Sequence, residues 1–413
     1  MGAPGPSLAR RAVPLAAYWA LGMAPFGLTL PYLGLYLREN AGLSGAQIGA
    51  VFAVTPAVGI LMQPIWGALG DRSGLRARML VVLSLGVGAG MLAFGRADGF
   101  AQILLASALL ASFARALIPM LLSVSLPALE DHVHAFGWVR AFGTIGFGAA
   151  MFAFPSALAQ FQAERGLVAN ERISEPGLGL LFPTAAALSL LAACVAMAIP
   201  NRGAVALRAH RGEWKVLLRN PRFLRVLAVC TIAFLCINGP MELFPIFVRE
   251  RGGDLGTVRD MWLFMLVPEV ALAAGLGTLS ARLGARTLLA IGLAAGSARW
   301  LLTAAVPSLP GLHVVQMLHA VVVLGLNIGA PLYVDAVVPP QLRSTAQALL
   351  GTVAVGIGGM GSSLLAGWLL ENGGASAPYW FGGAGAGALL LLLPRWLPAL
   401  EPRASMGSGD ASG

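Results

Sequence analysis

Charged residues are scarce in this chain: Asp, Glu, Lys and Arg make up 11% of its 413 residues, whereas 57% are hydrophobic. Soluble domains carry about a quarter charged residues, so the composition excludes an ordinary soluble protein. Apolar stretches of roughly 20 residues, long enough to cross a bilayer as helices, recur along nearly the whole length. They lack the alternation of a membrane β-barrel. The sequence therefore predicts an all-α membrane protein in contact with lipid.

Cysteines and the usual catalytic motifs are also few. The three cysteines, Cys194, Cys230 and Cys236, lie in apolar stretches without metal-ligand spacing, so we interpret them as small buried hydrophobic residues. The chain has no P-loop, nucleophile elbow, H-E-x-x-H or C-x-x-C motif, and we expect no cofactor, no metal and no enzyme activity. Its net charge of +9 is scattered between the apolar stretches, which argues against nucleic-acid binding.

Twelve apolar stretches predict twelve transmembrane helices, six on each side of a basic connection. We expect a first six-helix bundle over 1–199, a cytoplasmic linker over 200–224 with a short interfacial helix near Trp214, a second bundle over 225–398, and a cytoplasmic tail over 399–413. The predicted spans are 15–37, 46–69, 78–95, 102–126, 138–160, 178–199, 225–248, 261–280, 286–305, 312–335, 344–370 and 379–398.

The distribution of basic residues predicts the orientation. With both termini in the cytoplasm, external loops hold seven arginines and the spans hold Arg115 and Arg299, which leaves 18 of the 27 Lys and Arg on the cytoplasmic side. Membrane proteins carry such an excess of basic residues inside. We therefore expect a multi-pass protein of the plasma (inner) membrane, monomeric, with cytoplasmic termini.

Two loops about 210 residues apart share five of their ten positions, although Asp71 is replaced by Ala281: "GALGDRSGLR", 67–76, follows the second predicted span, and "GTLSARLGAR", 277–286, follows the eighth. A duplicated six-helix unit is typical of transporters. The first loop matches throughout the G-x-L-x-D-R-x-G-x-R signature of the major facilitator superfamily, which the chain resembles over almost its whole length. The resemblance implies two pseudo-symmetric bundles, alternating access, and a cytoplasmic gate that contains Asp71, Arg72 and Arg76.

Within that superfamily the chain is most similar to the lactose-permease and phenylpropionate-permease branch. "PALEDHVHAFGWVRAFGTIGFG", 127–148, resembles the junction of the fourth and fifth helices, where a Glu and an Arg bind the sugar in lactose permease. The resemblance implies substrate-binding roles for Glu130 and Arg140, and for Phe147 as the aromatic residue that stacks on the sugar. A solvated loop pair remains the alternative for Glu130 and Arg140.

A second resemblance to this branch lies between the tenth and eleventh predicted helices, at "PLYVDAVVPPQLRSTAQALLG", 331–351. It implies that Asp335 and Arg343 mirror Asp71 and Arg76 in the cytoplasmic gate. The alternative is that they only anchor the loop.

Ionisable residues interrupt the apolar stretches of the second half. At 1.5 Å per residue, Glu269 in "LVPEVALAAG" lies roughly 12 Å from the external edge, and Arg299 and His319 lie at about the same depth. An isolated charge there costs at least ~2.5–3.5 kcal/mol, so we expect Glu269 to pair with Arg299 beside a polar cavity. The resemblance supports this layer, because lactose permease carries Glu, Arg and His on its eighth, ninth and tenth helices.

Two further charges complete the set. Glu242 stands in "CINGPMELFPIF", where Gly239, Pro240 and Pro245 predict a broken helix. Arg115 in the fourth span is a candidate to receive a substrate. The proton-carrying Glu of lactose permease is replaced by Val322, so proton coupling depends on Glu269 or Glu242, with Arg299 and His319 beside them.

These residues favour a secondary transporter that imports a small polar or aromatic solute with protons. Arg140, Glu130, Phe147, Arg115, Arg299 and His319 are the predicted substrate-binding residues. A proton-antiport exporter of drugs or metabolites and a uniporter are the alternatives, and an intramembrane enzyme that uses Glu269, Arg299 and His319 as acid–base groups is a remote one. The sequence does not identify the substrate.

Overall fold

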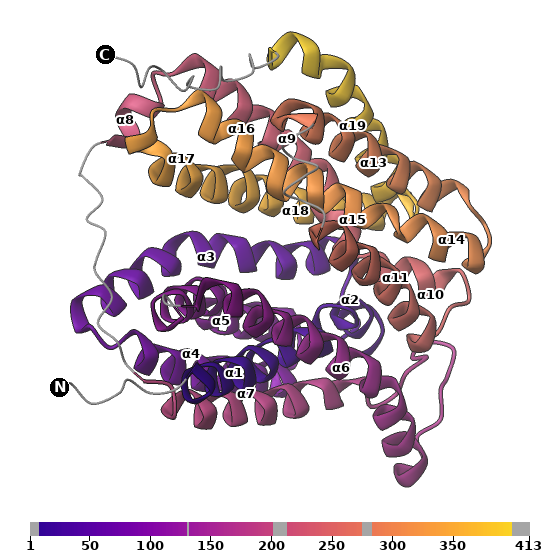
Figure 1. The fold of residues 1–413 in the computed structure, drawn as a ribbon. Coiled ribbons are helices and arrows are strands. Elements are labelled where there is room, and N and C mark those ends of the chain that lie inside the picture. Colours follow the sequence, from indigo (N-terminus) through magenta and orange to yellow (C-terminus); the bar gives the residue numbers. More distant parts are fainter. Residues whose placement is uncertain (1–7, 130–131, 201–212, 275–282, 399–413) are drawn as a thin grey trace, which may run out of the picture.

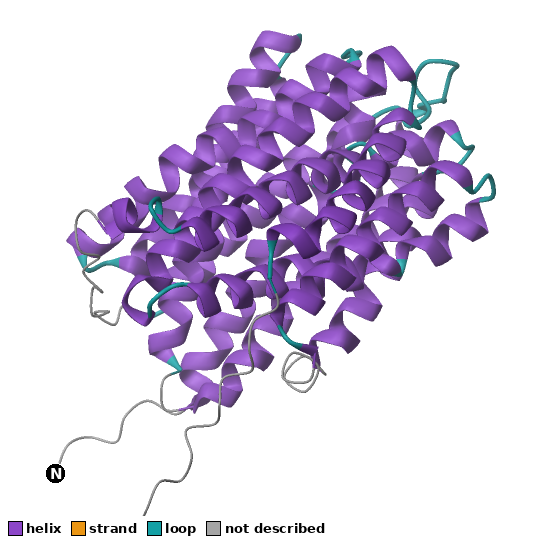
Figure 2. Ribbon diagram, turned by 90° about the horizontal axis from the view of Figure 1, so that it is seen from above, coloured by secondary structure: helices purple, strands orange, loops and turns teal. Residues whose placement is uncertain are grey.

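The computed structural model describes residues 8–129, 132–200, 213–274 and 283–398, and within these ranges the chain is helical without strands. Eleven of the described helices are long and apolar enough to cross a membrane. The remaining predicted span, 261–280, corresponds to α11, whose described part carries Arg259, Asp260 and Glu269. The prediction of an all-α membrane protein is therefore confirmed, and Figure 2 shows helices joined by short loops.

The helices form two bundles that lie against each other (Figure 1). The first bundle contains α1 (Leu8–Thr29), α2 (Leu33–Leu35), η1 (Tyr36–Asn40), α3 (Gly45–Ser73), α4 (Arg76–Arg96), α5 (Phe100–Ala128), α6 (Val133–Arg165), η3 (Leu178–Leu180) and α7 (Leu181–Met197). The second bundle contains α9 (Pro221–Glu242), α10 (Phe244–Glu250), α11 (Leu255–Ala274), α13 (Ala285–Ala305), α14 (Leu309–Gln316), α15 (Leu318–Val323), η4 (Leu324–Gly329), α16 (Ala330–Val337), η5 (Pro340–Leu342), α17 (Arg343–Leu349), η6 (Leu350–Gly358), α18 (Gly359–Gly373) and α19 (Ala377–Trp396).

A short helix, α8 (Glu213–Leu217), lies between the bundles where an interfacial helix is predicted. Residues 201–212 of the linker and the tail 399–413 are outside the described residues. The seventh predicted span is broken as expected, because α9 ends at Glu242 and α10 begins at Phe244. A buried hydrogen bond from the Gly239 amide to Ser362 Oγ, 2.6 Å long, holds α9 against α18 next to this break.

Packing within each bundle is dense. In the first bundle α6 and α7 pack on α1, and α5 and α7 pack on α4; in the second, α18 and α19 pack on α9. Buried hydroxyl groups form hydrogen bonds between helices, which offsets the cost of placing them in an apolar interior. The Tyr18 hydroxyl lies 2.7 Å from Ser84 Oγ and joins α1 to α4, and Ser297 Oγ donates to the Gly383 carbonyl at 2.8 Å and joins α13 to α19.

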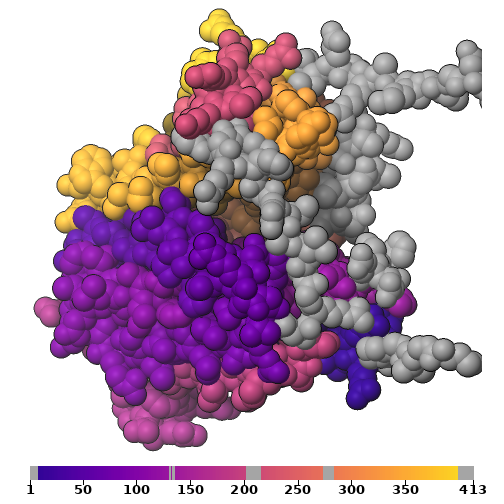
Figure 3. All heavy atoms as spheres, turned by 90° about the vertical axis from the view of Figure 1, so that its left-hand side faces the viewer, coloured from indigo at the N-terminus to yellow at the C-terminus, as the bar shows by residue number. Residues whose placement is uncertain are grey.

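The two bundles meet mainly through α3 with α18, α2 with α10, and α6 with α11. We name the two ends of the molecule by their turns: the Gly74 face, where α3 ends, and the Gly374 face, where α18 ends. Near the Gly374 face the backbones almost touch, since a Cβ on Gly45 would lie 2.6 Å from the Gly367 carbonyl oxygen. Figure 3 views the molecule from the Gly74 face, with the first bundle below the second.

Polar contacts join the bundles at the Gly374 face. Arg249 of α10 forms an ion pair with Glu39 of η1 at 3.6 Å, and the Arg259 guanidinium lies 4.9 Å from the centroid of the Phe152 ring. Glu371, near the end of α18, reaches the start of α3 in the other bundle. Its Oε2 accepts from the Ala46 amide at 2.7 Å and from Ser44 Oγ at 3.0 Å.

Glu371→Gln is expected to loosen this closure. A carboxylate at a helix N-terminus stabilises by about 1 kcal/mol, so neutralising it shifts the balance between closed and open forms roughly five-fold. The distance between spin labels at Arg38 and Asn372 reports the change. Glu250→Gln, which neutralises an exposed carboxylate at the end of α10, is the matched control and should leave the distance distribution unchanged. Equal distributions in the two variants would contradict the role of Glu371.

Candidate functional site

The centre of the site is Arg299 of α13, which is buried to 1% exposure. Its guanidinium donates to Gln316 Oε1 at 2.8 and 3.0 Å and to His319 Nδ1 at 2.9 Å. Two methionine sulfurs complete its shell, Met241 at 3.2 Å and Met265 at 3.4 Å, and it lies 4.1 Å from the centroid of the Trp300 ring. Two helical turns before Arg299, α13 and η4 approach closely at Gly292, where a Cβ would lie 2.6 Å from Gly325 Cα.

The expected direct pair between Glu269 and Arg299 is not formed. Glu269 Oε2 instead lies 3.9 Å from His319 Nε2, so the imidazole stands between the carboxylate and the guanidinium. The prediction that the three side chains converge in one layer is therefore confirmed, and their predicted pairing is wrong. The reason is that Gln316, one helical turn before His319, supplies a neutral acceptor to the guanidinium inside the bundle.

Glu269 faces the other bundle. Its side chain is 36% exposed, and Arg140 of α6 is the cation that acts electrostatically on its carboxylate. Phe147 of α6 lies near Trp262 of α11, with ring centroids 6.1 Å apart. Trp262 precedes Glu269 by two helical turns, so both lie on the same side of α11. Its Nε1 is buried and has no hydrogen-bond partner within the described residues.

A second charged group lies at the break in α9. Glu242 Oε2 accepts from Ser363 Oγ of α18 at 2.6 Å, and Arg115 of α5 is the cation that acts on this carboxylate. Arg115 belongs to the first bundle and Glu242 to the second, as Arg140 and Glu269 do. Thus, in the part of the chain that the structure describes, two carboxylates of the second bundle are each within electrostatic range of an arginine of the first bundle.

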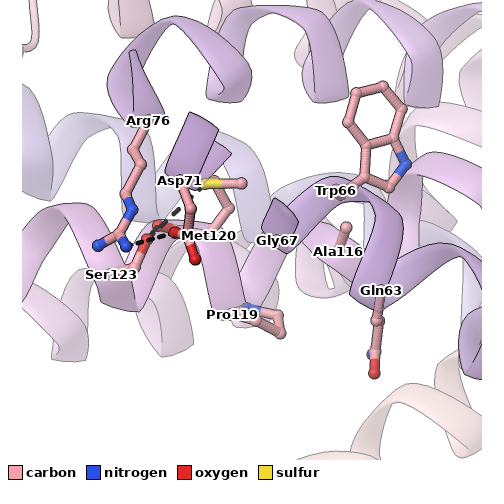
Figure 4. Close-up of a pocket in the computed structure, with 9 residues that line it drawn as sticks. All are labelled: Gln63, Trp66, Gly67, Asp71, Arg76, Ala116, Pro119, Met120 and Ser123. Atoms are coloured by element: carbon pink, nitrogen blue, oxygen red, sulfur yellow. Dashed lines mark hydrogen bonds and ion pairs between the residues drawn. The ribbon is translucent and has the colours of Figure 1, made fainter. Parts of the chain in front are cut away.

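The predicted gate residues lie near the Gly74 face, each group within its own bundle. Arg76 donates to Asp71, and both line a small hollow between α3 and α5 (Figure 4), in which Gln63 Nε2 donates to the Arg115 carbonyl at 2.8 Å. Arg72 is exposed at the end of α3.

In the second bundle Gln347 Nε2 donates to Asp335 Oδ1 at 2.8 Å and Arg343 Nε donates to the Asp335 carbonyl at 3.2 Å. These contacts and those of Asp71 remain inside one bundle, whereas the contacts at the Gly374 face cross between the bundles. A gate across the Gly74 face stays a prediction.

Sequence reasoning missed several members of the site, and one predicted member cannot be placed in it. Glu130 lies outside the described residues. Gln316 could have been found from its spacing, because it precedes His319 by three residues and so lies on the same helical side. Ser363 and Trp262 gave no comparable signal, since a serine in a glycine-rich span and a tryptophan near a span end are both common in membrane helices.

Comparison with known proteins identifies the wider group. The profile of the family described as "MFS_1 like family" matches residues 14–381. The chain is 25% identical over 384 residues to the uncharacterized transporter YwbF of Bacillus subtilis, covering 92% of each chain. It is 29% identical over 365 residues to a maltose permease of Geobacillus stearothermophilus, covering 86% of this chain and 87% of the permease.

Drug exporters and a nucleoside transporter are similar as well. The multidrug resistance protein MdtG of Escherichia fergusonii is 30% identical over 277 residues, which is 63% of this chain and 64% of that protein. Among solved structures, a point mutant of the nucleoside transporter NupG superposes with a TM-score of 0.82 at 17% identity, over 93% of this chain and 99% of that chain. That likeness concerns the fold.

Proposed function

This chain belongs to the MFS_1 like family and is a membrane transporter rather than an enzyme, and from that premise we propose that it imports a small polar solute together with a proton. The observation that supports the proposal is the position of Glu269. Its carboxylate lies 3.9 Å from His319 of the second bundle and is under the electrostatic influence of Arg140 of the first, so a proton and a solute can act on the same group. Transport of this kind requires that charge and occupancy be linked at one site.

The chemistry of the surrounding groups favours a solute with hydroxyl or amide groups. The site offers a carboxylate that accepts, an arginine and an imidazole N–H that donate, and two aromatic rings, Phe147 and Trp262, for an apolar face. This combination suits polyols and sugars, and a sugar is what the name of the maltose permease relative states for that protein. We therefore place sugars and polyols first, with nucleosides and aromatic acids as the other classes to test.

We propose the orientation and the gate from the same set of observations. The Gly74 face is assigned to the cytoplasm, because the basic linker and most arginines lie on that side in the sequence. With the bundles in contact at the Gly374 face, alternating access then consists of breaking the contacts of Glu371 and Arg249 while Asp71 and Arg343 form new ones across the Gly74 face. The protein is proposed to act as a monomer in the plasma (inner) membrane.

Uptake by proteoliposomes tests the proposal. A proton gradient directed into the vesicles should drive accumulation of at least one solute of the panel above the external concentration, and a protonophore should abolish it. Equilibration without accumulation would establish a uniporter. The MdtG relatives favour proton antiport as a second candidate, for which the same gradient would expel the solute.

Trp262→Ala is expected to weaken solute binding about five- to thirty-fold, because it removes the ring that lies next to Phe147. Aromatic contacts of this kind are worth roughly 1–2 kcal/mol. Trp262→Phe keeps a ring and removes the unpaired Nε1–H, so it separates stacking from hydrogen bonding. The apparent affinity is measured by counterflow, and Trp368→Ala, at a 55% exposed tryptophan of α18, is the matched control. Unchanged affinity in Trp262→Ala would remove Trp262 from the site.

A further inference from the structure

The imidazole of His319 is held on one side by a group that can only donate. Arg299 Nη1 lies 2.9 Å from His319 Nδ1, within hydrogen-bond distance. A guanidinium has five N–H donors and no acceptor, so Nδ1 must supply a lone pair to this bond. In the neutral ring the hydrogen is then on Nε2, since the partner of one ring nitrogen decides which nitrogen carries the proton. Nε2 is the atom that faces Glu269 Oε2 at 3.9 Å.

Arg299 is itself held in place by neutral partners. Gln316 is fully buried, its Nε2 donates to Thr303 Oγ1 at 3.3 Å, and its Oε1 accepts two bonds from Arg299. The amide is therefore oriented with its oxygen toward the guanidinium. In the described part of the chain the contacts of Arg299 are with an amide oxygen, an imidazole nitrogen, two sulfurs and the Trp300 ring. None of these groups carries a negative charge.

From this geometry we infer that Arg299 is a positioning residue, which fixes His319 as the Nε2–H tautomer so that the ring donates toward Glu269 and the solute. His319 cannot take a proton on Nδ1 while the Arg299 N–H occupies that lone pair. The imidazole is thus a donor, and the transported proton is carried by Glu269. The inference rests on the proposed function in one respect, namely that Glu269 carries the proton.

The ¹⁵N NMR spectrum of histidine-labelled protein in lipid nanodiscs reads the tautomer directly, because a ring nitrogen with a proton and one with a lone pair resonate far apart. The chain has five histidines, and the signals lost in His319→Gln assign the pair of interest. We expect Nε2 protonated and Nδ1 unprotonated in the unmodified protein. A proton on Nδ1 would overturn the inference without any need for an Arg299 variant.

Arg299→Met, which removes the donors and retains most of the volume, is expected to populate the form with a proton on Nδ1 and to lower solute uptake about ten-fold. In a His319→Gln background the same substitution should cost less than about three-fold, since a glutamine amide has no tautomer to fix. An unchanged tautomer in Arg299→Met, or an equal loss of uptake in both backgrounds, would assign Arg299 a structural role only. His313→Gln is the matched control, because His313 Nδ1 bonds to the Leu309 carbonyl of its own helix at 2.8 Å.

These readouts separate the inference from the proposed function. If the native protein shows no proton-driven uptake of any solute in the panel, the proposed function fails, and the tautomer of His319 is still decided by its spectrum. If the tautomer is Nδ1–H while Glu269→Gln abolishes coupling, the inference fails and the proposed function stands.

Discussion

Replacing Glu269 with glutamine is expected to abolish accumulation of solute against a gradient and to leave solute exchange across the membrane. The amide retains the size of the carboxyl group and its hydrogen-bonding capacity toward His319, but it cannot gain or lose a proton. Coupling free energies between two ligands are typically 1–3 kcal/mol, so proton-driven uptake should fall up to about 100-fold. Uptake under an imposed proton gradient and counterflow without a gradient measure the two quantities in the same vesicles.

The matched control for this variant is Glu371→Gln, which neutralises a carboxylate of the same bundle that contacts α3 rather than the site. It is expected to change the rate of transport and to retain accumulation. A Glu269→Gln protein that still accumulates solute would show that another group carries the proton, and Glu242 would be the first candidate. Loss of both exchange and accumulation would instead identify Glu269 as a residue required for solute binding.

The second large effect is a loss of thermal stability and transport, expected when Arg115 or Glu242 is neutralised. Glu242 is held by Ser363 in its own bundle and is within electrostatic range of Arg115 in the other, so removing either residue takes away part of what offsets the charge of the other. Coupling energies between interacting residues are typically about 0.5–3 kcal/mol. Arg115→Gln and Glu242→Gln should each reduce thermal stability and transport, whereas the double variant should regain much of the stability.

A double-mutant cycle makes this prediction quantitative. We expect a coupling energy of about 1–3 kcal/mol between Arg115 and Glu242, obtained from the unfolding of the four proteins in detergent. Arg115→Gln combined with Glu250→Gln is the control cycle, and its effects should add to within about 0.5 kcal/mol because Glu250 is exposed at the end of α10. Additive effects in the Arg115–Glu242 cycle would show that the two residues act independently.

The fold could be predicted from the sequence because its determinants are local. A run of about 20 apolar residues must become a helix in lipid, and the Gly and Pro residues around Glu242 leave few ways to continue that helix. Depth along a helix follows from the 1.5 Å rise, which is why Glu269, Arg299 and His319 were expected in one layer. The predicted span 261–280 stays a prediction, because α11, with Arg259, Asp260 and Glu269, is not among the described helices that are long and apolar enough to cross a membrane.

The partner of each side chain could not be predicted in the same way. Depth does not determine which way a long side chain turns around its helix, and Arg299 bonds to Gln316 and His319 although a carboxylate lies in the same layer. Nor does the sequence show that Arg115 acts electrostatically on Glu242, because the two lie in different bundles, whose arrangement follows from the packing of α3 on α18. The lactose-permease branch remains a prediction, since the relatives include a maltose permease and drug exporters alike.

The central claim is that Glu269 links proton and solute, and proton movement measures it most directly. Solutes from the sugar, polyol, nucleoside and aromatic-acid classes are added in turn to weakly buffered proteoliposomes while the external pH is recorded. The account predicts that one class makes the external medium more alkaline with the native protein, and that the same solute gives no pH change with Glu269→Gln. If the native protein takes up a solute of these classes and the external pH does not change, the account is contradicted.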